Sequence, residues 1–223
     1  MKAYGIDINP TLIHYNASIR NKLGIIQLLI EISSFLKVAD LQLLEELPET
    51  IEAAKIRLIL YVDKMSRIFI VEKDKIHSFF LPFSLQAESN KYRLFFNGYE
   101  ITPASCAVMS ATFNGLPIDI SVEEIIESYW DISADFDISE EEKKFYGKLI
   151  SYLLSFEPGY LRFDHDESHK NKIIHPDNHI DFNYTDGASF KLGLNNPLTY
   201  NDLIEILDIT KPCIHLTIPR KHN

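Results

Sequence analysis

Between residues 162 and 181 the sequence gathers side chains that bind metals and transfer protons. This stretch holds half of the chain's eight histidines, and several aspartates lie among them. These histidines are His165, His169, His175 and His179. Imidazole and carboxylate groups are the ligands that zinc, manganese and iron use in proteins. The same groups exchange protons near neutral pH, so the stretch is a candidate for metal binding or acid–base catalysis.

Two strand-like runs place several of these residues on one surface, because successive side chains of a strand point to opposite faces. If the two runs pair as a hairpin, one face carries a cation, three carboxylates and a histidine. These residues are Arg162, Asp164, Asp166, His179 and Asp181. The connecting loop then adds His169 and His175 above that face.

Two interpretations of the cluster stay open. In the first it is a functional site that holds a divalent metal or carries out catalysis. The metal ligands are then Asp164, His169, His175, His179 and Asp181. The catalytic residues are Arg162, Asp164, Asp166 and His179. In the second interpretation the hairpin is structural, with Arg162 paired to a carboxylate and the histidines capping turns.

The elements that position the cluster predict an α+β fold, with N-terminal helices, an antiparallel β-meander, and C-terminal helices with a small antiparallel sheet. A helix over 18–38 is apolar on most sides, which is typical of a core element. Residues 40–47 predict a second helix, and residues 67–102 predict the meander. Within that meander, Asn97-Gly98 between apolar runs indicates a tight hairpin turn.

The second half of the chain carries helix-start signals. Ser121 and Ser139 are each followed three residues later by glutamate, which is the pattern of a capping box. Thr199 begins a further helix. The strand candidates between the last two helices are 159–165, 179–184 and 188–193. We expect a single domain over 1–223, made of a helical segment (1–66), the β-meander (67–118) and a segment with helices and a hairpin (119–223).

The negative charge of the chain is concentrated in one segment. The formal net charge is −10, and residues 119–142 contain ten acids and no lysine or arginine. These acids are Asp119, Glu123, Glu124, Glu127, Asp131, Asp135, Asp137, Glu140, Glu141 and Glu142. Such a surface disfavours nucleic-acid binding and favours a basic protein partner. The alternative is two solvated helix starts, since acids stabilise helix N-termini.

Several function classes lack their motifs. No run of residues is apolar and long enough to span a membrane, and no signal peptide is apparent. Cys106 and Cys213 stand far apart, which excludes a thiolate zinc site and suits a cytoplasmic protein. The sequence contains no P-loop, dinucleotide-binding or hydrolase-elbow motif.

The C-terminal region resembles an uncharacterised family of bacterial cytoplasmic proteins, classed as a domain of unknown function. The resemblance covers residues 160–207 and rests on an RFDxD run from Arg162, a following histidine, HPxxH from His175, and a PLT run from Pro197. It departs from the family pattern at Asp181, where a second histidine is expected. It implies a bacterial source and a role in multi-gene defence or mobile cassettes.

Together these features predict a cytoplasmic accessory or partner-binding subunit of a bacterial multi-protein system. The alternative is a metal-dependent hydrolase or nuclease that uses the 164–181 cluster. A protein partner is expected, general nucleic-acid binding and membrane binding are not, and the only cofactor indicated is a divalent metal.

Overall fold

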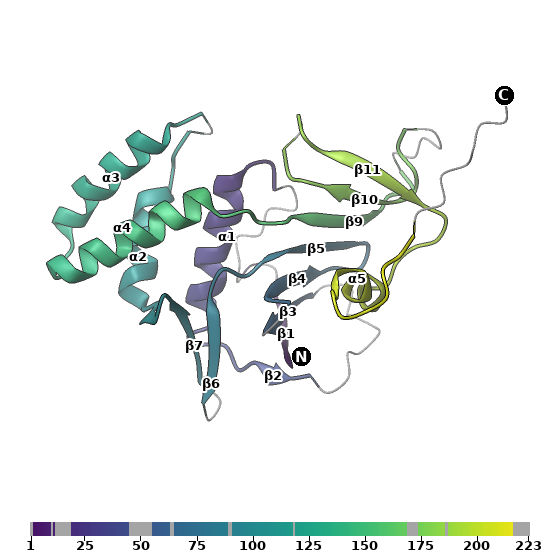
Figure 1. Ribbon diagram of the computed structural model, residues 1–223, viewed down its shortest axis with the longest axis horizontal. Helices are drawn as coiled ribbons and strands as arrows, with labels where there is room; N and C mark the ends of the chain where they lie inside the picture. Colours follow the sequence, from purple (N-terminus) through teal and green to yellow (C-terminus); the bar gives the residue numbers. More distant parts are fainter. Residues whose placement is uncertain are drawn as a thin grey trace.

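The computed structural model describes residues 2–9, 11, 19–44, 55–62, 65–88, 91–117, 119–168, 174–185 and 187–215. Within these ranges the chain forms five helices and two antiparallel sheets, one of eight strands and one of three (Figure 1). The predicted α+β class is therefore confirmed.

The larger sheet has the strand order β11-β10-β9-β5-β4-β3-β1-β2, and all of its neighbours pair antiparallel. Its strands are β1 (Lys2–Ile8), β2 (Gln42–Leu43), β3 (Ile56–Val62), β4 (Arg67–Val71), β5 (Lys75–Phe80), β9 (Leu161–His165), β10 (Asn178–Phe182) and β11 (Phe190–Leu194). The smaller sheet contains β6 (Ser84–Glu88), β7 (Lys91–Phe96) and β8 (Tyr99–Glu100).

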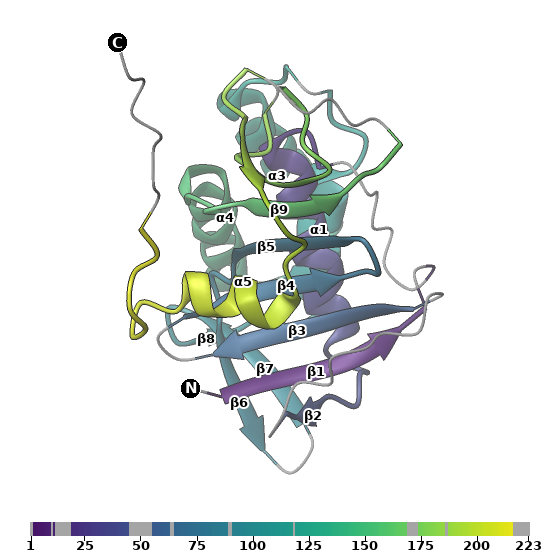
Figure 2. The same ribbon diagram turned by 90° about the vertical axis from the view of Figure 1, so that its right-hand side faces the viewer.

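Helices cover both faces of the larger sheet. They are α1 (Lys22–Phe35), α2 (Pro103–Phe113), α3 (Val122–Asp135), α4 (Glu140–Ser155) and α5 (Tyr200–Leu207). Helix α1 packs on one face, and α2, α3 and α4 extend that layer away from the sheet. On the opposite face, α5 is the one helix among the residues that the structure describes, as Figure 2 shows.

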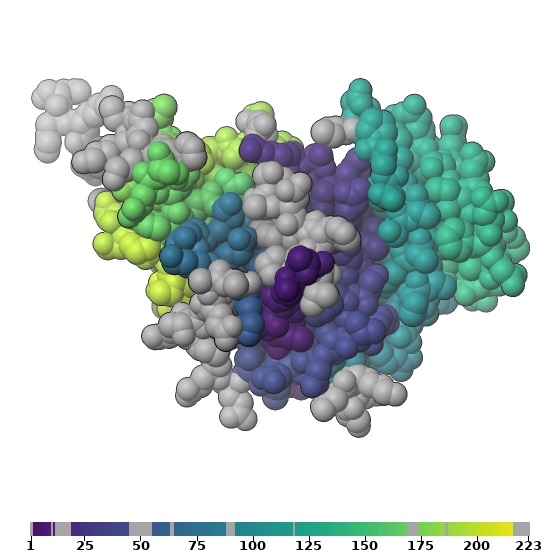
Figure 3. Space-filling model, turned by 180° about the vertical axis from the view of Figure 1, so that it is seen from behind, coloured from purple at the N-terminus to yellow at the C-terminus, as the bar shows by residue number. Residues whose placement is uncertain are grey.

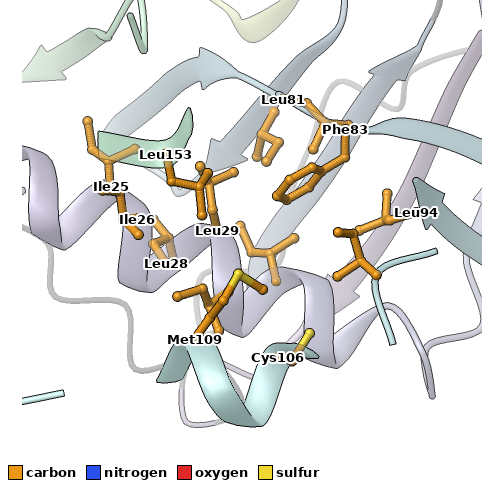
Figure 4. Close-up of a cluster of buried hydrophobic side chains, with 14 of the residues drawn as sticks. Ile25, Ile26, Leu28, Leu29, Leu81, Phe83, Leu94, Cys106, Met109 and Leu153 are labelled. Atoms are coloured by element: carbon orange, nitrogen blue, oxygen red, sulfur yellow. The ribbon is translucent and has the colours of Figure 1, made fainter. Parts of the chain in front are cut away.

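The main core lies where α1 meets the sheet and the other helices. Ile25, Ile26 and Leu29 of α1 are fully buried, as expected for a helix that is apolar on most sides. Figure 4 shows them facing Leu153 of α4 and Met109 of α2. The prediction of a core helix within 18–38 is confirmed over Lys22–Phe35.

Local signals predict the later elements well. Ser121 and Ser139 form complete capping boxes with Glu124 and Glu142, and each box begins a helix. Thr199 caps α5 in the same way. The turn at Asn97-Gly98 has positive φ at both residues and joins β7 to β8, so the predicted hairpin is confirmed.

The N-terminal region departs from the expectation. The helix predicted at 40–47 is wrong over Gln42–Leu43, which pair with β1 as strand β2, while residues 45–47 lie outside the described ranges. Residues 1–66, expected to be helical, have α1 as their single helix among the described residues and contribute three strands. Tertiary pairing overrides local helix preference here.

The C-terminal strands also lie elsewhere than expected. The sequence predicts a small separate sheet, but β9 pairs with β5 and so extends the main sheet. The predicted meander is divided, since β4 and β5 belong to the larger sheet and β6 to β8 form the smaller one. The main sheet therefore brings the histidine and aspartate cluster close to Ile19 and Arg20, just before α1. Figure 3 shows the α1 segment (purple) and the C-terminal region (green to yellow) on the same side of the molecule.

The acidic segment 119–142 lies on the surface. All ten of its acids are exposed, as predicted. No helix in the described ranges is long and apolar enough to cross a membrane.

Candidate functional site

The candidate site consists of two rows of polar side chains that cross the sheet from β5 to β11. Directly paired residues of neighbouring strands point to the same face. The first row is His77, Arg162, Asp181 and Lys191. The second is Lys75, Asp164 and His179, and it ends at Gly193, which pairs with His179 on β11. His77 pairs with Ile70, which packs in the core with α1, so both rows lie on the α1 face.

Arg162 joins the two carboxylates of the cluster. Its Nε donates to Asp164 Oδ2 at 2.7 Å, and its Nη2 donates to Asp181 Oδ2. Both aspartates are buried, so their charges depend on this cation. Burial lowers the pKa of Arg162, but Asp164 and Asp181 outweigh it and raise that pKa above its ordinary value. The predicted pairing of Arg162 with a carboxylate is confirmed.

Lys191 joins the other side of the cluster. Its Nζ lies 2.7 Å from Asp181 Oδ1 and 2.9 Å from His179 Nε2. His179 Nδ1 lies 2.9 Å from the carbonyl oxygen of Pro176, which only accepts, so Nδ1 carries the hydrogen and Nε2 accepts from Lys191. Burial and the Lys191 charge lower the pKa of His179. The imidazole is therefore neutral at pH 7.

A glycine on β11 fixes the position of His179. A Cβ at Gly193 would lie 2.7 Å from Pro176 Cγ, closer than real contacts allow. Glycine therefore lets Pro176 pack directly on the strand. From that position the Pro176 carbonyl accepts from His179 and sets the orientation of the ring.

Three potential metal ligands converge in this cluster. One ligand atom from each of Asp164, His179 and Asp181 lies within 4.8 Å of the others, and all three residues are buried. His179 Nε2 is 3.6 Å from Asp164 Oδ2 and 3.8 Å from Asp181 Oδ2. The one free lone pair of His179 Nε2 already accepts from Lys191, so a metal ion bound to His179 must displace Lys191.

The other predicted site residues lie at or beyond the edge of the cluster. The Asp166 carboxylate accepts from the backbone N–H and hydroxyl of Ser168, and it is not among the converging ligands. The His175 ring lies 4.6 Å from the His179 ring, and its buried Nδ1 has no hydrogen-bond partner among the described residues. His169 lies outside the described ranges.

Sequence reasoning misses three members of the network. Lys191 is absent from the predicted site, although its alternation along the predicted strand 188–193 is a usable signal. Tyr160 alternates with Arg162 and Asp164 along the predicted strand 159–165, which is also a usable signal. His77 has no such signal, because β5 is distant in sequence. His77 Nδ1 is 2.9 Å from the Tyr160 hydroxyl. Burial lowers the pKa of His77 well below its ordinary value and raises that of Tyr160 to about 12.

The arrangement has two chemical capacities. The two carboxylates and the neutral imidazole are a ligand set for a divalent metal, if Lys191 leaves. With Lys191 in place, the cluster holds two cations in fixed positions.

No family model, curated protein or solved structure matches the chain.

Proposed function

We propose that the chain is a partner-binding protein that recognises a basic protein surface through the outer face of α3. The outer face means Glu123, Glu127, Trp130 and Asp131, all of them exposed. The observation that carries the proposal is Trp130, which is 49% exposed on a helix surface between acidic side chains. Tryptophan is enriched among the residues that dominate binding energy at protein interfaces.

The charges of this face support a basic partner. Glu123, Glu127 and Asp131 follow one another at four-residue spacing, so they line one side of the helix. None of the three forms an ion pair with a described residue. Their combined field attracts cations and repels phosphate backbones.

The face is presented rigidly. On the opposite side of α3, Ile125 and Tyr129 are buried, and the Tyr129 hydroxyl donates to the Lys143 carbonyl on α4. Gly147 of α4 lets the Tyr129 ring pack closely, since a Cβ there would lie 3.2 Å from Cε1. A rigid helix loses little conformational entropy on binding, which favours its use as a docking surface.

The resemblance of residues 160–207 to a bacterial family supports placing this partner in a cytoplasmic multi-protein system. In that setting the chain acts as an accessory subunit, and the acidic face provides the contact.

Trp130→Ala is expected to weaken partner binding by roughly thirtyfold or more, the effect of losing a dominant interface residue. A photo-crosslinking amino acid in place of Ala134 identifies the partner in the source cells. Co-purification then measures how much of that partner each variant retains. Glu127→Lys combined with Asp131→Lys should have a similar effect and reduce the salt dependence of binding.

Glu141→Lys is the matched control, because it reverses an exposed acid outside this face. It should retain the partner. If the Trp130 and double-lysine variants keep the partner as well as this control does, with unchanged melting temperatures, the α3 proposal is wrong.

A metal-dependent hydrolase or nuclease is the second candidate, favoured by the convergence of Asp164, His179 and Asp181 within 4.8 Å. Its catalytic residues would be the four predicted from the sequence, in which Arg162 orients a carboxylate. These are Arg162, Asp164, Asp166 and His179. Because Lys191 occupies the same atoms, it competes with any metal.

Titration of the untagged protein with Zn²⁺ and Mn²⁺ tests this candidate. If a metal binds, Lys191→Met should raise its affinity, and His179→Ala and Asp164→Ala should abolish binding. Metal ligation needs neutral imidazole, and burial and Lys191 lower the pKa of His179. Acidification should therefore weaken metal binding only at a pH below the ordinary pKa of histidine. Lack of binding by both wild type and Lys191→Met contradicts the candidate.

A further inference from the structure

A pocket of about 270 Å³ lies beside the cluster, between the segment before α1 and the strands β10 and β11. Three cations line it, namely Arg20, Arg162 and Lys191. Figure 1 shows the start of α1 next to the C-terminal strands at this place. The pocket therefore joins two regions of the chain that are far apart in sequence.

The pocket walls carry an excess of positive charge and of hydrogen-bond donors. Among the described lining residues the one carboxylate is Asp181, which already accepts from Arg162 and Lys191. Ser189 and Tyr184, which carry hydroxyl groups, also line the pocket. Asn183 Oδ1 accepts from the Tyr184 backbone N–H at 2.6 Å, so its amide NH₂ remains as a donor.

Two of the cations are held in place before any ligand binds. Asp164 and Asp181 fix the guanidinium of Arg162, and Asp181 and His179 fix the ammonium of Lys191. Side chains fixed in this way lose little rotamer entropy when they bind a ligand. The side chains of Arg162 and Lys191 are 19% and 30% exposed, so their charges are only partly screened by water.

We propose that this pocket binds a phosphate group, either free or as the monoester of a small molecule. Arginine and lysine together with hydroxyl and amide donors match the several acceptor oxygens of phosphate. The pocket is at the small end of ligand-site volumes, which fits a phosphate group with a short substituent. The net charge of −10 opposes a long polyanion.

Isothermal titration of the full chain with inorganic phosphate and with glycerol 3-phosphate tests the proposal. Binding of either ligand supports it, and the tighter of the two identifies the source of the phosphate. Arg20→Met and Lys191→Met should each weaken binding by roughly tenfold or more, as expected for the loss of one charge-assisted contact. Arg20 is exposed, so its replacement opens no cavity in the core.

Arg93→Met is the matched control. It removes the same charge from β7, where Arg93 pairs with Glu100, and it should leave phosphate affinity unchanged. The proposal is overturned if the wild type binds neither ligand when the ligand concentration reaches about 10 mM, which is well above the Kd of a specific small-molecule site. It is also overturned if Arg93→Met weakens binding as much as Arg20→Met does.

Discussion

Leu29→Asp and Leu149→Asp are each expected to unfold the protein at room temperature. Leu29 of α1 and Leu149 of α4 belong to one core cluster and are 1% and 0% exposed. An unpaired carboxylate at such a position costs several kcal/mol or more, while the whole stability of a domain is about 5–15 kcal/mol. Each substitution also removes the packing of a leucine, which adds about 2–5 kcal/mol.

Circular dichroism melting of the purified variants measures this effect. Val38→Asp is the control, because Val38 follows the same helix but is 85% exposed, and it should melt like the wild type. A soluble Leu29→Asp or Leu149→Asp protein with an unchanged melting temperature contradicts the placement of α1 and α4 in the core.

The elements that the sequence predicts best depend on neighbouring residues. The capping boxes at Ser121 and Ser139 and the turn at Asn97-Gly98 form within a few residues, so their chemistry can be read from the sequence. The apolar character of α1 likewise indicates burial without knowledge of its neighbours.

The elements that sequence reasoning misses depend on distant pairing. Strand β1 pairs with β3 on one side. On its other side, Tyr4 and Gly5 pair with Leu43 and Gln42, and this pairing makes the short segment β2 a strand. The stretch 40–47, which includes β2, contains leucines and glutamates that favour a helix. The join between β5 and β9 brings together segments separated by all of α2, α3 and α4, which no local pattern reveals.

The candidate site shows the same division. Period-two alternation correctly places Arg162, Asp164, His179 and Asp181 on one face, because β9 and β10 form a hairpin. Alternation does not give register with β5 or β11, so it misses the contributions of His77 and Lys191. Lys191 changes the chemistry most, because it occupies the atoms that a metal ion needs.

Arg162→Met is expected to lower the free energy of unfolding by about 3–5 kcal/mol, the usual cost of removing one partner from a buried ion pair. Asp164 and Asp181 stay buried in this variant and lose the guanidinium that lies between them. Lys75, 3.9 Å from Asp164, and Lys191 remain nearby, so the loss should lie toward the lower end of that range. Urea unfolding of both proteins measures the difference.

Two comparisons separate this effect from a general loss of charge. Arg93→Met removes an arginine that is 44% exposed from its pair with Glu100, and it should cost less than about 1 kcal/mol. Adding Asp164→Asn and Asp181→Asn to Arg162→Met removes both buried charges and should restore most of the lost stability, because neutral amides cost less to bury. If the asparagine substitutions deepen the loss instead, the carboxylates stabilise the fold through contacts other than Arg162, and the charge-pair account of the cluster fails.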